Sequence, residues 1–236
     1  MIGIGKFFWG LLGDLSGTAM TEFALALPLL LTAGLYGAET ANLVLVNMKV
    51  SQLAMHIADN ASRIGDTSQI SNRKIFESDI NDLLAGSNIQ AGGSLNFYEH
   101  GRAIISSDEI FNRGVSCAYG GCPRGPHPDG TQFIHWQRCK GKKVWASNYG
   151  AENAILPSGI GPLGQEVIPE TGGAVIFVEV AYDYQPLASS RFFGPTTVTA
   201  ISSFMVRENI DLSGLKQRNP SSPDTPATCN VYSGYP

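Results

Sequence analysis

Basic residues are scarce in this chain, and their scarcity excludes some classes of protein. The 236 residues include 16 Lys and Arg against 20 Asp and Glu, so the formal net charge is −4. This balance provides no basic surface for nucleic acid. The first seventeen residues, MIGIGKFFWGLLGDLSG, contain only Lys6 and Asp14 as charged side chains. They therefore lack the positive region that a secretory signal places directly before its apolar core.

Recognisable catalytic motifs are also missing. The chain contains no G-x-S-x-G, no H-E-x-x-H and no phosphate-binding loop. Glu179 and Asp183 lie four residues apart on one expected strand, which separates them by roughly 13 Å, too far for two-carboxylate catalysis. We expect these two residues to anchor loops or lie on the surface, and we expect neither an enzyme nor a cofactor.

A long apolar run is the strongest feature that is present. No charged residue occurs from Phe23 to Ala38; Glu39 then interrupts the run, and Leu43 to Val46 extends it. The whole stretch reaches the roughly 20 residues that a helix needs to cross a bilayer. Glu39 is expected in the outer interface, near Lys49 or Asn42.

The best small-residue junction, Ser16-Gly17, precedes the apolar run. A secretory signal has its cleavage site on the other side of the apolar core. Cleavage after Gly17 would instead leave the apolar helix on the mature protein, with Thr18 as its first residue and Glu22 as its fifth. This order favours cleavage on the N-terminal side of the apolar helix.

The segment Gly17–Pro28, GTAMTEFALALP, resembles the opening of TadE/TadG-like proteins, the minor pilins or pseudopilins of the tight-adherence (Flp) pilus. Their usual pattern is G-x-x-x-x-E-F-A-x-x-x-P, a form of the class III signal of type IV pilins. Three later strings are similar to the periplasmic part of these proteins: WQRC at 136–139, VEVAYDYQPL at 178–187 and VRE at 206–208.

The resemblance implies a function and a set of site residues. A prepilin peptidase would cut between Gly17 and Thr18, and Glu22 and Phe23 would take part in assembly. The partners would be other pilus subunits and the inner-membrane assembly machinery. The protein would cross the bacterial inner membrane once, with its C-terminal domain in the periplasm, and would enter a surface pilus or help to build one. The alternatives are an uncleaved, membrane-anchored binding or adhesive domain and an anchored periplasmic enzyme.

Glu22 has a physical role independent of the resemblance. Cleavage would give Thr18 a positive α-amino group, and a carboxylate in a low-dielectric setting is stabilised by a nearby cation. Glu22 would pair with that amine on its own chain or on a neighbouring subunit. The alternative is that Glu22 only extends into the lipid headgroups.

All four cysteines, Cys117, Cys122, Cys139 and Cys229, follow the apolar run, and an even number in a translocated domain is typical of disulfides. We favour Cys117 with Cys122 across a glycine-rich turn. Cys139 with Cys229 would join a strand to the C-terminal tail, for about 4–5 kcal/mol of stabilisation. The alternative pairs Cys117 with Cys139, and Cys122 with Cys229.

The same region contains a candidate metal set, formed by Cys117, Cys122, His127, His135 and Cys139. Its spacings, Cys-x4-Cys and His-x7-His, are wider than the pairs typical of structural zinc sites. Oxidising surroundings also favour disulfides over zinc. We therefore expect no metal, with His135 in a sheet and His127 in a loop.

The periodicity predicts an α+β fold, and the resemblance implies that this fold is of the pilin type. Apolar residues recur at steps of three and four after the membrane run, at Leu43, Val46, Val50, Leu53, Ile57, Ala61 and Ile64. One helix, 18–64, should follow a leader, 1–17, and precede a periplasmic domain, 65–236. In that domain we expect a helix at 71–84, capped by Ser71 and ended by Gly86. An antiparallel sheet of four or five strands should follow, at 94–98, 102–106, 132–139, 173–184 and 196–206, the first two joined by a turn at 99–101.

Overall fold

The computed structural model describes residues 16–65, 74–116, 127–187, 194–206 and 211–234. The chain divides into two compact units. The first contains residues up to 44 together with 186–193, and the second contains 45–185 and 194–236. The boundary falls inside the long N-terminal helix, so the second half of that helix belongs to the folded domain.

Helix α2, Ser16–Ala61, is continuous over 46 residues and passes through Pro28 without a break. Its second half is amphipathic, as the spacing predicts. Seven apolar residues of this half are buried: Val46, Val50, Leu53, Ala54, Ile57, Ala58 and Ala61. After Ala61 the chain turns, and Arg63 pairs with Asp59 at 2.8 Å one turn earlier. The buried stripe makes this half of α2 the central helix of the domain.

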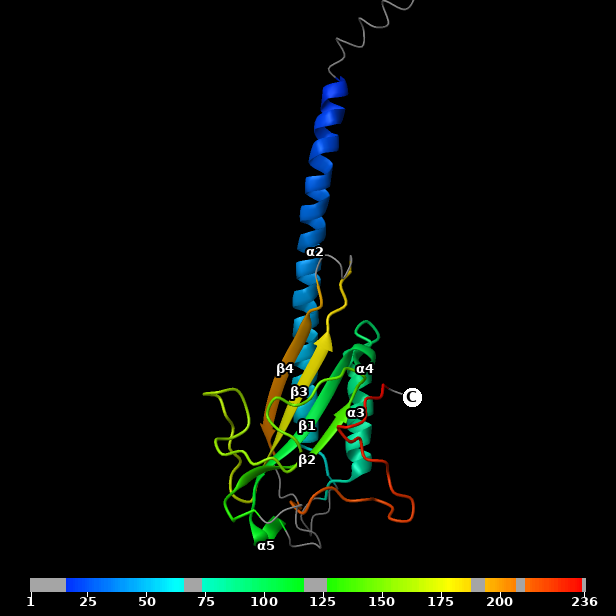
Figure 1. Ribbon diagram of the computed structural model, residues 1–236. Helices are drawn as coiled ribbons and strands as arrows, with labels where there is room; N and C mark the ends of the chain where they lie inside the picture. The colour runs from blue at the N-terminus through cyan, green and yellow to red at the C-terminus, as the bar shows by residue number, and fades with distance from the viewer. Residues whose placement is uncertain (1–15, 66–73, 117–126, 188–193, 207–210, 235–236) are drawn as a thin grey trace, which may run out of the picture. The chain divides into compact units, whose positions relative to one another are not determined.

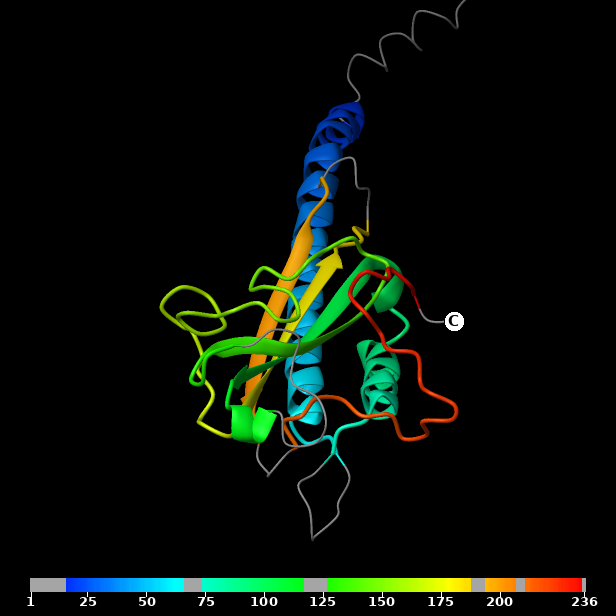
Figure 2. The ribbon, with the colours of Figure 1, turned by 60° about the horizontal axis from the view of Figure 1, so that its bottom comes forward.

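The sheet has four antiparallel strands in the order β2-β1-β3-β4. They are β1, Gly101–Ile110; β2, Gln132–Lys140; β3, Ala174–Asp183; and β4, Thr197–Met205. Figure 1 shows the second half of α2 running behind this sheet, and Figure 2 shows the same arrangement from another side. The α+β fold class, a long helix packed on an antiparallel sheet, is confirmed. The three strands expected at 132–139, 173–184 and 196–206 are present within a residue or two of the expected ends.

The two faces of the sheet are covered differently. Residues directly opposite each other on antiparallel strands share a face, so Arg138, Ile105 and Val178 lie on one face and Cys139, Ile104 and Glu179 on the other. Arg138 bonds to Glu77 of α3, so the first face is the helical one. The second face is covered by the 141–172 connection and the C-terminal tail, through contacts described below.

Helix α3 spans Glu77–Ala91, and Phe76 before it has an extended backbone, so the expected bounds 71–84 were wrong at both ends. Ser71 lies outside the described residues. The Asp79 carboxylate accepts a hydrogen bond from the Phe76 N–H at 3.3 Å, and acidic residues in the first turn suit the helix dipole. The helix ends at Gly92, whose φ of 75° favours glycine, instead of at Gly86.

The expected strand at 94–98 and turn at 99–101 were also wrong. Asn96 has a left-handed backbone with φ 42°, and one helical turn, α4, Phe97–His100, follows it. Phe97 and Tyr98 are both buried, whereas neighbours on a strand face opposite sides. The Tyr98 hydroxyl donates to the Leu84 carbonyl at 2.6 Å, which ties this turn to α3. A second short helix, α5, Arg113–Ser116, follows β1.

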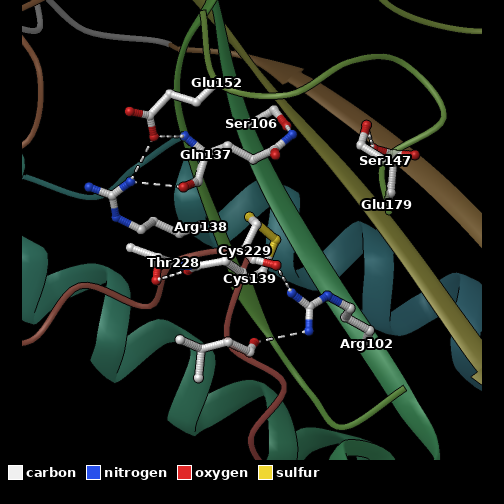
Figure 3. The surroundings of a disulfide bond; sticks show 12 residues. Arg102, Ser106, Gln137, Arg138, Cys139, Ser147, Glu152, Glu179, Thr228 and Cys229 are labelled. Carbon is white, nitrogen blue, oxygen red and sulfur yellow. Dashed lines mark hydrogen bonds and ion pairs between the residues drawn. A yellow bond between two sulfur atoms is a disulfide. The ribbon is translucent and has the colours of Figure 1, made fainter. Parts of the chain in front are cut away.

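A disulfide and a buried arginine hold the C-terminal tail on the sheet. The structure joins Cys139 of β2 to Cys229, the pairing favoured above. Arg102 of β1 is fully buried beside it and donates to the carbonyls of Gly141, Val231 and Cys229 at 3.0, 3.2 and 2.6 Å. Its guanidinium lies 4.2 Å from the centre of the Tyr232 ring. Figure 3 shows Arg102 and the disulfide together.

Replacing both Cys139 and Cys229 by Ser should lower the free energy of unfolding by about 3–5 kcal/mol, because the bond closes a loop of about 90 residues in the unfolded chain. Urea unfolding of the detergent-solubilised protein measures the change. Non-reducing peptide mapping of the parent should recover the two cysteines in one linked peptide. A linked Cys117–Cys139 peptide, or equal stability of the double variant and the parent, would contradict the assignment.

Candidate functional site

The first half of α2 exposes apolar side chains on every side. All residues from Gly17 to Ala38 are exposed, including Met20, Phe23, Leu25, Leu29, Leu30, Leu31, Leu35 and Tyr36. Within the described residues this is the one helix long and apolar enough to cross a membrane, judged by length and composition alone. A membrane anchor and a signal sequence both meet this description. A helix that is apolar all round needs lipid or other helices around it.

The expected processing residues lie in the first turn of this helix. Gly17 follows Ser16, where α2 begins, and the Thr18 carbonyl accepts a hydrogen bond from the Thr21 hydroxyl at 2.8 Å. A Cβ atom added to Gly17 would have no neighbour within 4 Å. Packing within this chain therefore does not require glycine at position 17, and a requirement for it must come from another molecule.

Glu22 and Phe23, the expected assembly residues, are both exposed on α2. Glu22 is four residues after Thr18, so the two lie on the same face of the helix, one turn apart. An α-amino group created at Thr18 would be within reach of the Glu22 carboxylate. The Phe23 ring, 59% exposed, lies beside it on the apolar surface.

Glu39, at the other end of the apolar stretch, is buried, with 2% of its surface exposed. Its two carboxylate oxygens accept hydrogen bonds from the Leu187 N–H at 3.2 and 3.0 Å. Both residues belong to the first unit. Lys49, which the sequence suggested as a neighbour of Glu39, donates to the Ser94 hydroxyl instead. Glu39 therefore holds the backbone of Leu187 against the helix.

Each residue of the WQRC string on β2 makes a different contact, and Figure 3 shows Gln137, Arg138 and Cys139. Trp136 is buried in the core, and the Gln137 amide donates to the Ser106 hydroxyl and the Gly150 carbonyl. Arg138 forms a two-pronged ion pair with Glu77 of α3 and also reaches Glu152 at 3.2 Å. Cys139 carries the disulfide. This string is therefore where β2 is joined to α3, to the 141–172 connection and to the tail.

The second string, VEVAYDYQPL on β3 and after it, anchors loops in the same way. Glu179 is fully buried and accepts hydrogen bonds from the Ser147 hydroxyl and the Asn148 N–H. Burial raises the pKa of Glu179, and these two hydrogen bonds oppose the shift. Asp183 pairs with Lys143 and accepts from the Thr197 hydroxyl. The loop-anchoring role expected for the two carboxylates is confirmed.

The structure describes only some of the remaining residues that the sequence analysis singled out. Cys117, Cys122, Arg207 and Glu208 lie outside the described residues. His135 is in β2, as expected, and its Nδ1 lies 2.9 Å from the Glu109 carboxylate. His127 packs against the rings of Phe111 and Phe133. Among the residues that the structure describes, no three His, Cys, Asp or Glu side chains are grouped to hold a metal ion.

A buried acidic pair, which the sequence analysis did not identify, lies at a bulge between β1 and β2. The register shifts between Ser107 and Asp108, so that His135 has no direct partner opposite it. Glu109 accepts from the Ser107 hydroxyl at 2.8 Å, as well as contacting His135. Asp108 is fully buried and accepts from the Gln132 amide. Burial raises the pKa of Asp108 to about 7, the Gln132 bond opposes this, and the negative charge of Glu109 adds to it.

Arg102, Glu39 and Asp108 were therefore missed as structural anchors. For Glu39, after an uncharged run, and Arg102, before Ala-Ile-Ile, the signal in the sequence was a charged residue in an apolar segment, whereas Asp108 follows two serines and gave no such signal. Burying such a group costs free energy unless it is paired or hydrogen-bonded. Each one therefore required a partner, although the sequence did not show which.

Comparison of the chain with protein-family models, with curated proteins and with solved structures finds no match. The functional assignment therefore depends on the residues and contacts described above.

Asp108→Asn should stabilise the protein at pH 8 and have less effect at pH 5. The folded state keeps the Asp108 proton up to about pH 7, whereas the unfolded carboxyl loses it near 3.8. The free energy of unfolding therefore falls as the pH rises from 3.8 to about 7, and it stays low above pH 7. Asparagine carries no charge and still accepts from Gln132, so we expect a gain of about 1–3 kcal/mol at pH 8.

Urea unfolding at pH 5 and pH 8 measures this difference, with the exposed Asp82→Asn as the matched control. The control should show no pH-dependent gain. A gain of equal size at both pH values would mean that the Asp108 carboxyl does not titrate between them.

Proposed function

We propose that this chain is a structural or assembly subunit of a tight-adherence pilus, similar to a minor pilin or pseudopilin and processed after Gly17. One observation carries the proposal: α2 starts with the Gly17–Phe23 pattern, exposes an apolar surface on all sides and continues unbroken into the core of the domain. A signal peptidase acting after the apolar run would have to cut inside this helix. Retention of the helix on the mature protein fits the structure better.

The proposed location is the bacterial inner membrane, with one pass and a periplasmic C-terminal domain. The apolar half of α2 is long enough for the pass. The Cys139–Cys229 disulfide supports an oxidising compartment for the domain, because disulfides are rare in the cytosol. The charges before and after the pass are too few to orient it by the positive-inside rule.

The proposed partners are other pilus subunits, a prepilin peptidase and the inner-membrane assembly machinery. The apolar surface around Phe23 would pack against the corresponding helices of neighbouring subunits, and Glu22 would pair with a Thr18 amine on its own chain or the next. The role is one of assembly and requires no catalysis. Glu22 is suited to it because it is the only charged residue between Gly17 and Ala38.

A second candidate is an uncleaved, membrane-anchored binding or adhesive domain. The observation that favours it is a cavity of about 400 Å³ between α3, β2 and the tail. Its lining includes Leu84, Ala85, Lys140, Thr228 and Val231. N-terminal sequencing of the protein from the membrane separates the two candidates, since only prepilin processing gives a start at Thr18.

Gly17→Leu should leave the leader attached and retain the longer form in the membrane. The substitution meets no steric obstacle in this chain, so a processing defect would reflect recognition by the peptidase. Gly34→Leu is the matched control, because Gly34 also lies on α2 with open space around it and should be processed like the parent. Mass spectrometry of the purified protein measures both. Equal processing of Gly17→Leu and the parent would rule out this cleavage site.

Glu22→Ala should leave membrane insertion intact and impair piliation. Removing the carboxylate eliminates a cost of up to about 3 kcal/mol in an apolar phase, but it also removes the partner of the Thr18 amine. Insertion is measured by alkaline extraction, and assembly by co-purification with pilus subunits and by counting surface pili. A deletion strain complemented with the parent chain provides the reference.

Glu22→Asp, which keeps the charge on a shorter side chain, should retain more pili than Glu22→Ala. If Glu22→Ala restores pili as well as the parent does, then Glu22 only extends into the headgroups.

A further inference from the structure

The two edges of the sheet differ in what covers them. At the β2 edge, the Cys139 N–H donates to the Ala227 carbonyl of the tail at 2.7 Å. Further along the same edge, the Ile134 N–H donates to the Ala154 carbonyl at 3.0 Å. The bulge between β1 and β2 also interrupts the regular register on this side of the sheet. The β2 edge is therefore capped by other segments of the same chain.

Strand β4 forms the opposite edge, and half of its backbone groups point away from the sheet. The Val206 N–H donates to the Ala174 carbonyl at 2.9 Å, and the Tyr184 N–H donates to the Thr196 carbonyl at 2.8 Å. In this register the even-numbered residues of β4 bond to β3, and bonding alternates along an antiparallel pair. The N–H and C=O groups of the odd-numbered residues therefore face outward. These residues are Thr197, Thr199, Ile201, Ser203 and Met205. No other segment of the described chain hydrogen-bonds to these ten backbone groups.

The β4 edge also lacks the features that usually protect an edge strand. Natural edge strands avoid pairing with other chains by being short, by a bulge, by proline or by charged side chains. β4 is nine residues long, contains neither proline nor a charged residue, and pairs with β3 without a shift in register. Its outward-facing residues include Ile201, 42% exposed, and Met205, 41% exposed. Such an edge is a template for a further strand.

We propose that β4 binds an extended segment of another protein, which adds a fifth strand to the sheet. Only a second backbone matches a row of alternating donors and acceptors. Ten such groups are about as many as the direct hydrogen bonds of a typical protein–protein interface. No charged residue occurs from 195 to 206, so a charged segment would lose water here without gaining an ion pair. The partner segment is therefore uncharged, with β-branched or hydroxyl side chains that pair with those of β4.

A second copy of this chain is the competing occupant. β4 could pair with its own copy about a two-fold axis at Ile201, and that pair would be antiparallel. Figure 1 shows β4 running in the same direction as the second half of α2, and both belong to the second unit. Self-pairing would thus turn this half of α2 in opposite directions in the two copies. The proposed function packs the helices of neighbouring subunits side by side in one direction. The choice of a different protein rests on that function, whereas the open edge does not.

Amide hydrogen exchange of the full chain, purified alone in detergent, tests whether the edge is open. The odd-numbered amides of β4 should exchange at least about tenfold faster than the even-numbered ones, because only the even-numbered amides are bonded to β3. Strand β1 is the control, since it pairs on both sides and should be protected at odd and even positions alike. Equal protection of odd and even amides in β4 would mean that the edge is already covered, and would overturn the proposal.

Photo-crosslinking in the native cells tests the occupant. The crosslinking residue benzoylphenylalanine replaces Thr199 in the full chain. We expect a covalent adduct with a different protein, identified by mass spectrometry. The same residue at position 163 is the matched control and should give no such adduct, because Leu163 is 98% exposed and lies outside the sheet. An adduct between two copies of this chain would overturn the choice of partner.

Variants at Ile201 distinguish strand addition from a side-chain contact. In the protein with the crosslinker at 199, Ile201→Pro removes an outward N–H and no bond to β3, a position at which edge strands tolerate proline. The adduct should fall severalfold. Ile201→Ala keeps the N–H and should retain the adduct, and an equal loss in this variant would assign the contact to the side chain. Ile201→Lys, which places a charge on the edge, should behave like the proline variant. Near-UV circular dichroism shows that each variant is folded. An undiminished adduct in both the proline and lysine variants would overturn strand addition.

Benzoylphenylalanine at Leu30, on the apolar half of α2, separates failure of this inference from failure of the proposed function. This position should crosslink to other pilus subunits. If it does so while position 199 gives no adduct, the assembly role stands and β4 is not a docking edge. If position 199 gives an adduct that depends on the residue 201 N–H while position 30 gives none, strand addition stands and the assembly role is wrong. No adduct at either position would overturn both.

Discussion

The continuity of α2 is the constraint on which the fold depends. One helix has apolar side chains exposed on all sides near its start, and a single buried stripe from Val46 to Ala61. A helix satisfies its backbone hydrogen bonds internally, so it can pass from an apolar phase to water without leaving polar groups unpaired. The sheet needs a helix on one of its faces, and the second half of α2 provides it. The apolar, exposed segment and the central helix of the domain are thus one element.

The other face of the sheet is covered by irregular chain, and this explains its buried polar residues. A loop cannot satisfy its own backbone groups as a helix does, so it needs partners from the surface on which it packs. Arg102 provides three hydrogen bonds to carbonyls, Gln137 bonds to the Gly150 carbonyl, and Glu179 accepts from the Asn148 N–H. These side chains come from the strands, and the disulfide adds a covalent link at the same place. They add to direct backbone hydrogen bonds between these segments and β2, such as those from Ile134 N–H to the Ala154 carbonyl and from Cys139 N–H to the Ala227 carbonyl.

Local patterns predicted much of the fold, and long-range contacts account for most of the errors. The stripe on α2 and strands β2, β3 and β4 follow from periodicity and β-branched composition, which are local properties. The strand expected at 94–98 failed because Asn96 takes a left-handed turn and Tyr98 bonds back to Leu84 of α3. At the candidate site, Gly17, Thr18, Glu22 and Phe23 could be identified from a short motif. Glu39 could not be interpreted, because its partner Leu187 is 148 residues away.

The two carboxylates of the apolar stretch differ in a way that bears on the proposed function. Glu39 is buried and holds a segment of its own chain, whereas Glu22 is exposed. A carboxylate next to lipid needs a compensating partner. At Glu39 the chain itself contributes such a partner, the Leu187 N–H. At Glu22 the proposed partner is an amine created only by cleavage, on the same chain or on a neighbour. Under the proposed function, Leu187 would therefore be held on the helix before processing, and the assembly end of the helix would become competent only after the leader is removed.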